Sequence, residues 1–342
     1  MNFKKLNKTY IIAEIGVNHN GDIKLAKRLI VKAKEAGADA VKFQTFKAST
    51  LALENTKKTR YQKTNTKKPD ENHFDMLKKL ELKFSDFVKL KKFSKIKKID
   101  FISTPYDIES AKFLLKIGVK VIKVSSADLV DMAMNRYLSK KKCSVILSLG
   151  MANLDEIKKL LRIYKNKNKN NIALLHCISN YPCSLKSINL NFLKTLKKTR
   201  LVFGFSDHSI SDLPSVMTIA LGGQIIEKHI TLNKNMKGPD HKSSLNIIEL
   251  KKFINNLRNA ELILGKNVKI CQKEERDMKR ISRKSILSKK DILKGEVFTN
   301  NNITFKRPGS GLSPLQYLDK ILGKKAKTLI KKDTQIKINN FK

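Results

Sequence analysis

Short runs rich in β-branched residues recur eight times in this chain, and most are followed by a stretch with helical spacing. This alternation is typical of βα units built around a parallel sheet. The helical stretch at residues 23–37, for example, ends in a glycine, a common C-cap signal. We expect strands at YIIAEIG (10–16), ADAVKFQTF (38–46), DFISTPY (100–106), KVIKVSS (120–126), SVILSLG (144–150), IALLHCI (172–178), LVFGFSD (201–207) and QIIEKHI (224–230).

Eight strand and helix pairs over about 255 residues predict a (β/α)8 TIM barrel. A doubly wound sheet is the alternative, but its usual glycine-rich phosphate motifs, GxGxxG or GxxxxGK[ST], do not occur. We assign residues 1–270 to the barrel, 271–283 to a charged linker and 284–342 to a small β-rich domain. This last domain is marginal in size for its own core, so we expect it to lean on the barrel or on another subunit.

The charge balance raises a different class of function. Lysine and arginine number 72 against 30 acidic residues, a net charge of +42, which is typical of proteins that bind nucleic acid or an anionic surface. Only ten of the 72 are arginines, whereas phosphate clamps and groove readers favour the guanidinium group. The excess is spread along the chain together with abundant asparagine and isoleucine. This pattern favours background composition over nucleic-acid binding, which remains an alternative.

The chain start lacks the apolar run of a signal peptide, and no stretch reaches the roughly 18 apolar residues of a membrane span. Cys143, Cys177, Cys183 and Cys271 form neither a CxxC pair nor a zinc-ligand spacing. We therefore expect a cytoplasmic protein with reduced, mostly structural thiols and no membrane partner. One long polar segment, residues 47–83, separates the second strand from its helix and resembles an active-site loop more than a connector.

Reactive residues of a barrel lie where its strands end. The polar residues at those positions are Glu14, Asn18, Lys42, Gln44, Thr104, Lys123, Ser126, Ser148, His176, Tyr181, Ser206, Asp207, His208 and His229. His208 and His229 close neighbouring strands, a placement that suits a divalent transition metal, although each could instead be a structural histidine.

Lys42 and Lys123 end two strands inside an apolar barrel, where an unpaired ammonium is costly, so each should meet an anion. A phosphate or carboxylate fits, and four short hydroxyl side chains at the same mouth could cradle it, unless they only begin loops. In the segment GPDH, Asp240 and His241 follow the eighth strand, and either could reach the mouth.

Several motifs resemble the sialic acid synthase family: AEIGVNHNGD (13–22), VKFQT (41–45), ISTPYD (102–107), ILSLGMA (146–152), HCISNYP (176–182), GFSDHS (204–209), EKHITL (227–232) and GPDHKSSL (238–245). In addition, KRPGSGLSP (306–314) resembles the C-terminal antifreeze-like (SAF) domain of that family. The resemblance implies condensation of phosphoenolpyruvate with an N-acetylmannosamine-type sugar and water, giving N-acetylneuraminate and phosphate. It also implies a divalent metal, usually Mn²⁺, with Mg²⁺ or Co²⁺ as alternatives. Legionaminate or pseudaminate synthesis from a diacetamido-trideoxyhexose is the alternative within this chemistry.

The resemblance also implies roles for individual residues. His208 and His229 take the metal-ligand positions, and Asp207 orients their loop. Glu14, Gln44, Tyr181 and Asp240 match positions that line the sugar site or transfer protons. The positions that hold the phosphate and carboxylate of phosphoenolpyruvate are Lys42, Thr104, Lys123, Ser126, Ser148 and Ser206. Glu14, Lys42, Lys123, Asp207 and Tyr181 form the expected catalytic set.

Arg307 is implied to contact the N-acyl group of the substrate from the SAF domain of a partner subunit, which predicts a domain-exchanged homodimer. Three positions depart from the commoner family pattern and concern the sugar end. Asp128 replaces a glutamate, Ser179 stands before Asn180 where some members have asparagine, and Leu149 replaces a frequent threonine. The GPDH and NHNG motifs favour the neuraminic or legionaminic branch over the pseudaminic one.

Overall fold

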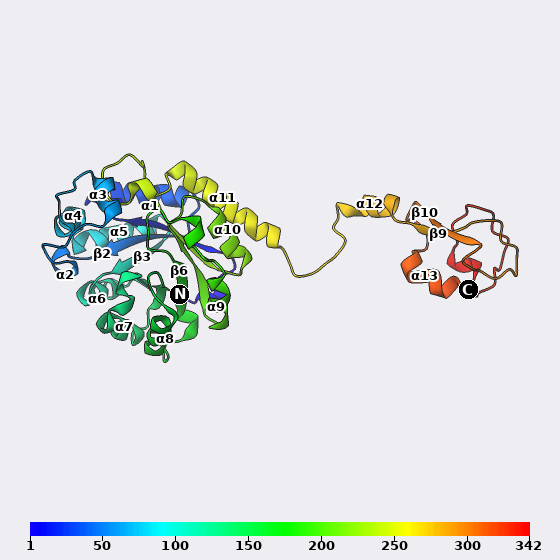
Figure 1. The fold of residues 1–342 in the computed structure, drawn as a ribbon, viewed down its shortest axis with the longest axis horizontal. Helices are drawn as coiled ribbons and strands as arrows, with labels where there is room; N and C mark the ends of the chain where they lie inside the picture. The colour runs from blue at the N-terminus through cyan, green and yellow to red at the C-terminus, as the bar shows by residue number, and fades with distance from the viewer. The chain divides into compact units, whose positions relative to one another are not determined.

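The computed structural model describes residues 1–342, which form two compact units, Met1–Gly265 and Lys266–Lys342. The first unit is a closed barrel of eight parallel strands in sequence order (Figure 1). This closed order confirms the TIM barrel and excludes the doubly wound sheet. The strands are β1 (Tyr10–Gly16), β2 (Ala40–Thr45), β3 (Asp100–Pro105), β4 (Val121–Val124), β5 (Ser144–Ser148), β6 (Ile172–Cys177), β7 (Val202–Asp207) and β8 (Ile225–His229).

Helices follow each strand and cover the outside of the barrel. Side-chain caps begin several of them: Asp22 accepts from the Lys24 N–H, and Asn153 forms a capping box with Glu156. The covering helices are α1 (Ile23–Glu35), α5 (Phe84–Ile96), α6 (Ile108–Lys116), α7 (Met132–Ser139), α8 (Leu154–Ile163), α9 (Phe192–Lys198), α10 (Leu213–Ala220) and α11 (Ile247–Leu264).

The inside of the barrel changes character along its axis. Alternate residues of each strand face inward, so a short strand contributes only two or three side chains to the interior. At the amino end these are apolar, among them Ile12, Ile102, Ile146 and Ile225, and Phe3 packs into the same cluster. At the carboxyl end the inward positions are polar. The apolar layer therefore closes one end of the barrel, and the polar layer forms the mouth.

Strands β7 and β8 approach each other unusually closely at one point. A Cβ on Gly204 would lie 1.9 Å from the carbonyl oxygen of Ile225, so only glycine fits there. The contact lies at the amino end of β8, and from there the two strands run side by side toward His208 and His229.

The long insertion after β2 is not a plain loop. It contains α2 (Ala48–Leu51), α3 (Arg60–Thr66) and α4 (His73–Leu80), gathered at one side of the barrel (Figure 1). The buried Lys58 ammonium fixes the segment by donating to the Lys68 carbonyl at 2.6 Å and to Glu71 at 2.9 Å. The inner face of α4 is apolar, because Met76, Leu77 and Leu80 recur at helical spacing.

The second unit contains α12 (Glu275–Ser282), the antiparallel pair β9 (Ser285–Ser288) and β10 (Ile303–Lys306), and α13 (Pro314–Ile321). It has a small hydrophobic core of its own, in which Phe298 and Ile321 are almost completely buried. Much of the charged segment assigned as linker is the helix α12. All four cysteines are free thiols, and no helix is long and apolar enough to cross a membrane.

Candidate active site

A polar cavity of about 280 Å³ opens at the carboxyl mouth of the barrel. The strand ends or the loops that follow them supply most of its lining, as the sequence predicts for a barrel enzyme. The predicted site residues that line it are Glu14, Lys42, Gln44, Thr104, Lys123, Ser126, Ser148, Ser179, Tyr181, Ser206, His208 and His229.

Four charged side chains alternate in sign at the bottom of this cavity. The Lys42 ammonium lies 3.0 Å from Glu14 and 3.7 Å from Glu227, and the Lys123 ammonium lies 3.2 Å from the same Glu227 oxygen. Ser206 donates a hydrogen bond of 2.9 Å to that oxygen. Both lysines are thus held at fixed positions by carboxylates that are themselves buried.

These contacts separate the pKa values of the two carboxyl groups. Burial acts to raise the pKa of Glu227, but Lys123 and Lys42 outweigh it, and its pKa falls to about 2. Burial dominates at Glu14, so its pKa rises despite the neighbouring Lys42. Glu227 is therefore a permanent anion that anchors the lysines, whereas Glu14 can exchange a proton.

His208 and His229 lie beside each other, with ring centroids 5.7 Å apart. The His208 Nδ1 atom bonds the Ile178 carbonyl at 2.7 Å, which favours a proton on Nδ1 and leaves Nε2 as an acceptor, 3.5 Å from the Ser206 hydroxyl. The Nδ1 atom of His229 is buried without a hydrogen-bond partner. Burial, with His208 and Lys42 adding to it, lowers the pKa of His229 well below its usual value. Burial acts to lower the pKa of His208 as well, but the neighbouring Cys177 outweighs it and the pKa rises. His229 can therefore offer a lone pair at neutral pH, whereas His208 would release a proton when it binds a metal.

A second, larger chamber of about 510 Å³ adjoins the polar cavity, and Gln44, Tyr61, Tyr106, Tyr181 and His229 line both. The predicted residues Asp128 and Asp240 line this chamber. Burial raises the pKa of Asp128 to about 6, and burial together with Glu14 raises the pKa of Asp240 to about 7. The Tyr181 ring packs on the imidazole of His208, with centroids 4.0 Å apart.

Some predicted residues are not part of this group. The Asp207 carboxylate pairs with Lys228 at 3.0 Å and accepts bonds from Ser209 and Ser215, so it organises the loop after β7 without lining the cavity. Asn180 is exposed and donates to the Pro182 carbonyl.

Three further strand-end or motif residues make structural contacts. His176 bonds the Ile188 carbonyl, and Asn18 donates to the Ile230 carbonyl. Of Asp240 and His241 in the GPDH segment, only Asp240 reaches the chamber, because His241 bonds Thr231 and Asn20.

Arg307 belongs to the second unit, directly after β10, and its side chain is exposed.

Sequence reasoning missed eight residues that line the polar cavity: Thr59, Tyr61, Tyr106, Ser125, Ala127, Met151, Cys177 and Glu227. Glu227 could have been found, because it lies two residues before His229 on the same strand and must share its face. No sequence pattern indicates that Tyr61 lies in the cavity. It belongs to the insertion, and only the tertiary fold brings its ring to 5.2 Å from Tyr181.

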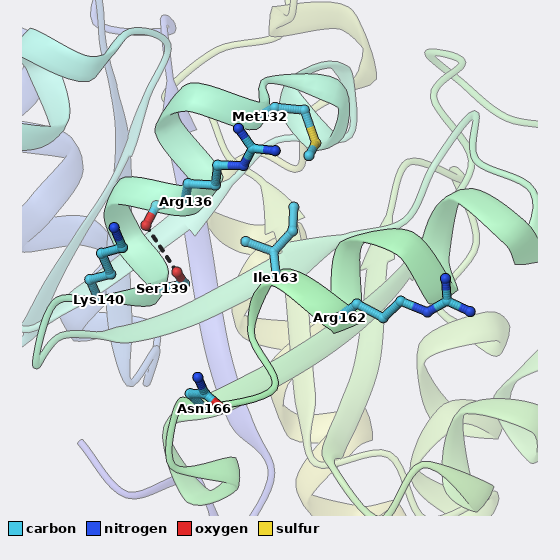
Figure 2. Close-up of a pocket in the computed structure, with 7 residues that line it drawn as sticks. All are labelled: Met132, Arg136, Ser139, Lys140, Arg162, Ile163 and Asn166. Atoms are coloured by element: carbon cyan, nitrogen blue, oxygen red, sulfur yellow. Dashed lines mark hydrogen bonds between the residues drawn. The ribbon is translucent and has the colours of Figure 1, made fainter.

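A larger surface depression of about 670 Å³ lies between α7 and α8 (Figure 2). It is lined by Met132, Arg136, Ser139, Lys140, Arg162, Ile163 and Asn166. Figure 2 shows the side chains of Arg136, Lys140 and Arg162 pointing apart, and the lining includes no carboxyl, imidazole or thiol group. This depression lacks the convergent groups that catalysis requires, so we place the active site at the barrel mouth.

Comparison with known proteins decides the family. Residues 29–269 match the NeuB family, and residues 283–342 match the SAF domain. The chain belongs to the NeuB family. It is 43% identical to the N,N'-diacetyllegionaminic acid synthase of Campylobacter jejuni, covering 97% of this chain and 100% of that protein. It is 34% identical to the pseudaminic acid synthase of the same strain, covering 99% of this chain and 98% of that protein.

Among solved structures, the N-acetylneuraminic acid synthetase of Leptospira borgpetersenii is similar, with a TM-score of 0.71 and 33% identity. That match covers 80% of this chain and 90% of the other. Membership of the NeuB family with a C-terminal SAF domain makes the chain a phosphoenolpyruvate-dependent nonulosonic acid synthase. The sequence-based expectation of family and reaction type is therefore confirmed at this level.

Proposed function

We propose that this NeuB-family enzyme condenses phosphoenolpyruvate and water with 2,4-diacetamido-2,4,6-trideoxymannose, giving N,N'-diacetyllegionaminic acid and phosphate. The observation that carries the proposal is the pairing of two buried lysines with hydroxyl groups at the barrel mouth. Lys42 donates to Thr104 at 3.1 Å, and the buried Ser148 hydroxyl has no partner. This arrangement suits a ligand that carries both a phosphate and a carboxylate.

Two carboxyl groups with raised pKa values support the proton transfers that the reaction needs. C3 of phosphoenolpyruvate attacks the sugar aldehyde carbon, water adds to the cation left at C2, and the C2–O bond to phosphate then breaks. We assign Glu14 to accept the proton of the attacking water and Asp240 to donate a proton to the aldehyde oxygen. Lys42 and Lys123 hold the anionic groups throughout.

A divalent metal fits between His208 and His229, with Mn²⁺ as the first choice and Mg²⁺ or Co²⁺ as alternatives. The unpartnered Nδ1 atom of His229 is a suitable donor, and so is the Nε2 atom of His208, which has a contact of 3.5 Å with the Ser206 hydroxyl. No group of three or more His, Cys, Asp or Glu side chains converges there, so water and substrate would complete the coordination. When bound, the metal supplies a Lewis acid that polarises the aldehyde.

The comparisons favour the diacetamido sugar over N-acetylmannosamine, which was the first expectation from the sequence. Identity is 43% to the diacetyllegionaminic acid synthase, against 34% to the pseudaminic acid synthase and 33% to the N-acetylneuraminic acid synthetase. The first two percentages refer to proteins of one bacterial strain, so they compare substrate types within one organism.

Arg307 supports a further part of the proposal. We assign it to contact an N-acyl group of the sugar bound in the barrel of a partner subunit, in a domain-exchanged homodimer. Its exposed guanidinium takes part in none of the ion pairs of the structure, so it is available to a ligand.

The test is phosphate release from phosphoenolpyruvate with Mn²⁺ and three sugars: 2,4-diacetamido-2,4,6-trideoxymannose, its altrose counterpart and N-acetylmannosamine. We expect the first to be turned over most efficiently. His208→Ala and His229→Ala should abolish turnover and weaken Mn²⁺ binding measured by electron paramagnetic resonance, whereas His176→Gln, which changes a histidine outside the cavity, should do neither. Absence of phosphate release with all three sugars would refute the proposed function.

A further inference from the structure

The chamber that adjoins the polar cavity differs from it sharply in chemistry. The insertion supplies most of its wall. Its apolar members are Leu51, Ala52, Leu53, Met76, Leu77 and Leu80, and its polar members are Thr56, Tyr61, Gln62 and His73. The other polar groups of the chamber include Asp128, Asp240 and Gln44, and two of the residues shared with the polar cavity are Tyr181 and His229. A molecule that spans both spaces would therefore meet charge at one end and an apolar wall at the other.

The apolar wall is held in place by polar contacts at its base. The Ala48 N–H at the start of α2 donates to Glu81 at 2.9 Å, just beyond the end of α4. Asn65 at the end of α3 donates to the Pro239 carbonyl at 2.6 Å, which ties the insertion to the segment that carries Asp240. A wall fixed at both ends can discriminate between ligands by shape and polarity, because it does not need to be ordered when a ligand binds.

We propose that this chamber is the subsite for the methyl-bearing groups of the acceptor sugar, and that Leu53, Met76 and their neighbours select deoxy and acetamido substituents against hydroxyls. The inference rests on the proposed function, and it adds which part of the structure determines the specificity for the sugar. With the aldehyde at the junction of the two spaces, C4 to C6 of the open chain extend into the chamber. There the diacetamido sugar presents an acetamido methyl and a C6 methyl, where N-acetylmannosamine presents hydroxyls.

The physical reason is that removing a methyl group from water is favourable, whereas removing a hydroxyl group from water is costly. A methyl group against leucine and methionine gains from burial, whereas a hydroxyl turned toward these side chains gives up its water without finding a partner in them. One methyl group in such a pocket, or one hydroxyl excluded from it, changes kcat/KM by roughly 10- to 200-fold.

The experiment compares kcat/KM for 2,4-diacetamido-2,4,6-trideoxymannose with that for N-acetylmannosamine, in the full-length Mn²⁺-loaded enzyme. The variants are Leu53→Ser and Met76→Gln. The matched control is Leu262→Ser on α11, because Leu53 and Leu262 are both 78% exposed and neither change should disturb folding. Thermal unfolding of Met76→Gln, whose side chain is buried, checks that its effect is local.

We expect each chamber variant to reduce the preference for the diacetamido sugar by about tenfold or more, with the KM for phosphoenolpyruvate unchanged and Leu262→Ser indistinguishable from the parent. A ratio that stays within about twofold of the parent in Leu53→Ser and Met76→Gln would overturn the inference and leave the proposed function standing. Equal use of both sugars by the parent enzyme would overturn it as well. Failure to use any sugar would overturn the proposed function itself.

Discussion

At the scale of single residues, burial decides which carboxyl groups can exchange protons. Glu227 lies against two lysines and stays ionised, with a pKa of about 2. Asp240 is equally buried but has no lysine partner, so burial and the nearby Glu14 raise its pKa to about 7. A carboxyl group thus supplies an anchoring anion in the polar cavity and a proton donor in the adjoining chamber.

This difference predicts a pH dependence for catalysis. If protonated Asp240 donates to the aldehyde oxygen, kcat/KM for the sugar should fall as pH rises through about 7, because the raised pKa leaves the acid form dominant only below that value. Asp240→Asn should lower kcat by about 10²- to 10⁴-fold and remove this alkaline limb. A pH–rate profile of phosphate release provides the measurement, and persistence of the limb in Asp240→Asn would contradict the assignment.

At the scale of elements, an ion pair outside the barrel mouth supports the two histidines inside it. Lys228 on β8 lies 3.0 Å from Asp207 on β7 and donates to the Ser209 carbonyl. Each partner immediately precedes a histidine of the site, His229 and His208 respectively. The pair therefore joins two strand ends behind the cavity and fixes the separation of the imidazoles in front of it.

Lys228→Met should destabilise the barrel by about 3–5 kcal/mol, because it leaves the buried Asp207 carboxylate without its cation. Urea unfolding followed by circular dichroism measures the loss. The double variant Asp207→Asn with Lys228→Met removes both charges and should recover part of it. A loss below about 1 kcal/mol in the single variant would mean that the pair does not hold these strand ends together.

At the scale of the whole molecule, the proposed exchange of SAF domains can be tested by complementation. His208→Ala disables the barrel and leaves Arg307 intact, whereas Arg307→Ala does the reverse. In a hybrid dimer, the intact barrel of the second chain would receive the intact Arg307 of the first. We expect co-expressed variants, assayed at a sugar concentration far below the KM of Arg307→Ala, to release phosphate faster than either variant alone. No recovery from a verified hybrid dimer would rule out a lid supplied by the partner.

The Arg307→Ala variant should also affect the KM values of the two substrates differently. Arg307→Ala should raise the KM for the sugar much more than the KM for phosphoenolpyruvate, because the contact is assigned to an N-acyl group. Steady-state kinetics with each substrate varied in turn make the comparison. Equal effects on both KM values would contradict the contact.

The net charge of +42 is also a property of the whole chain. A positive field attracts an anionic substrate over distances that salt shortens to about 10 Å at 0.1 M. We expect kcat/KM for phosphoenolpyruvate to fall as NaCl is raised, while kcat at saturating substrate changes little. Replacing NaCl with an uncharged osmolyte is the control. If kcat/KM for phosphoenolpyruvate does not change as NaCl is raised, the positive charge has no role in attracting this substrate.

Much of this architecture follows from local sequence patterns. The alternation of β-branched runs with helical stretches predicts the barrel, because the two periods require different backbone geometries. The carboxyl ends of the strands then identify the mouth. Charged and imidazole groups are rare inside a barrel unless they have a functional role. The sequence therefore identifies Lys42, Lys123, His208 and His229 as candidates there.

Tertiary structure alone decided how those residues work. Glu227 meets both lysines, and Asp207 meets Lys228, because the register of neighbouring strands decides which side chains lie opposite each other. A polar segment of the sequence became the apolar wall of a chamber, because α4 turns Met76, Leu77 and Leu80 inward and leaves its lysines in water. The sequence by itself determined the strand order and the chemistry available at the mouth. Which groups meet, and with what pKa, depended on contacts between residues distant in the chain.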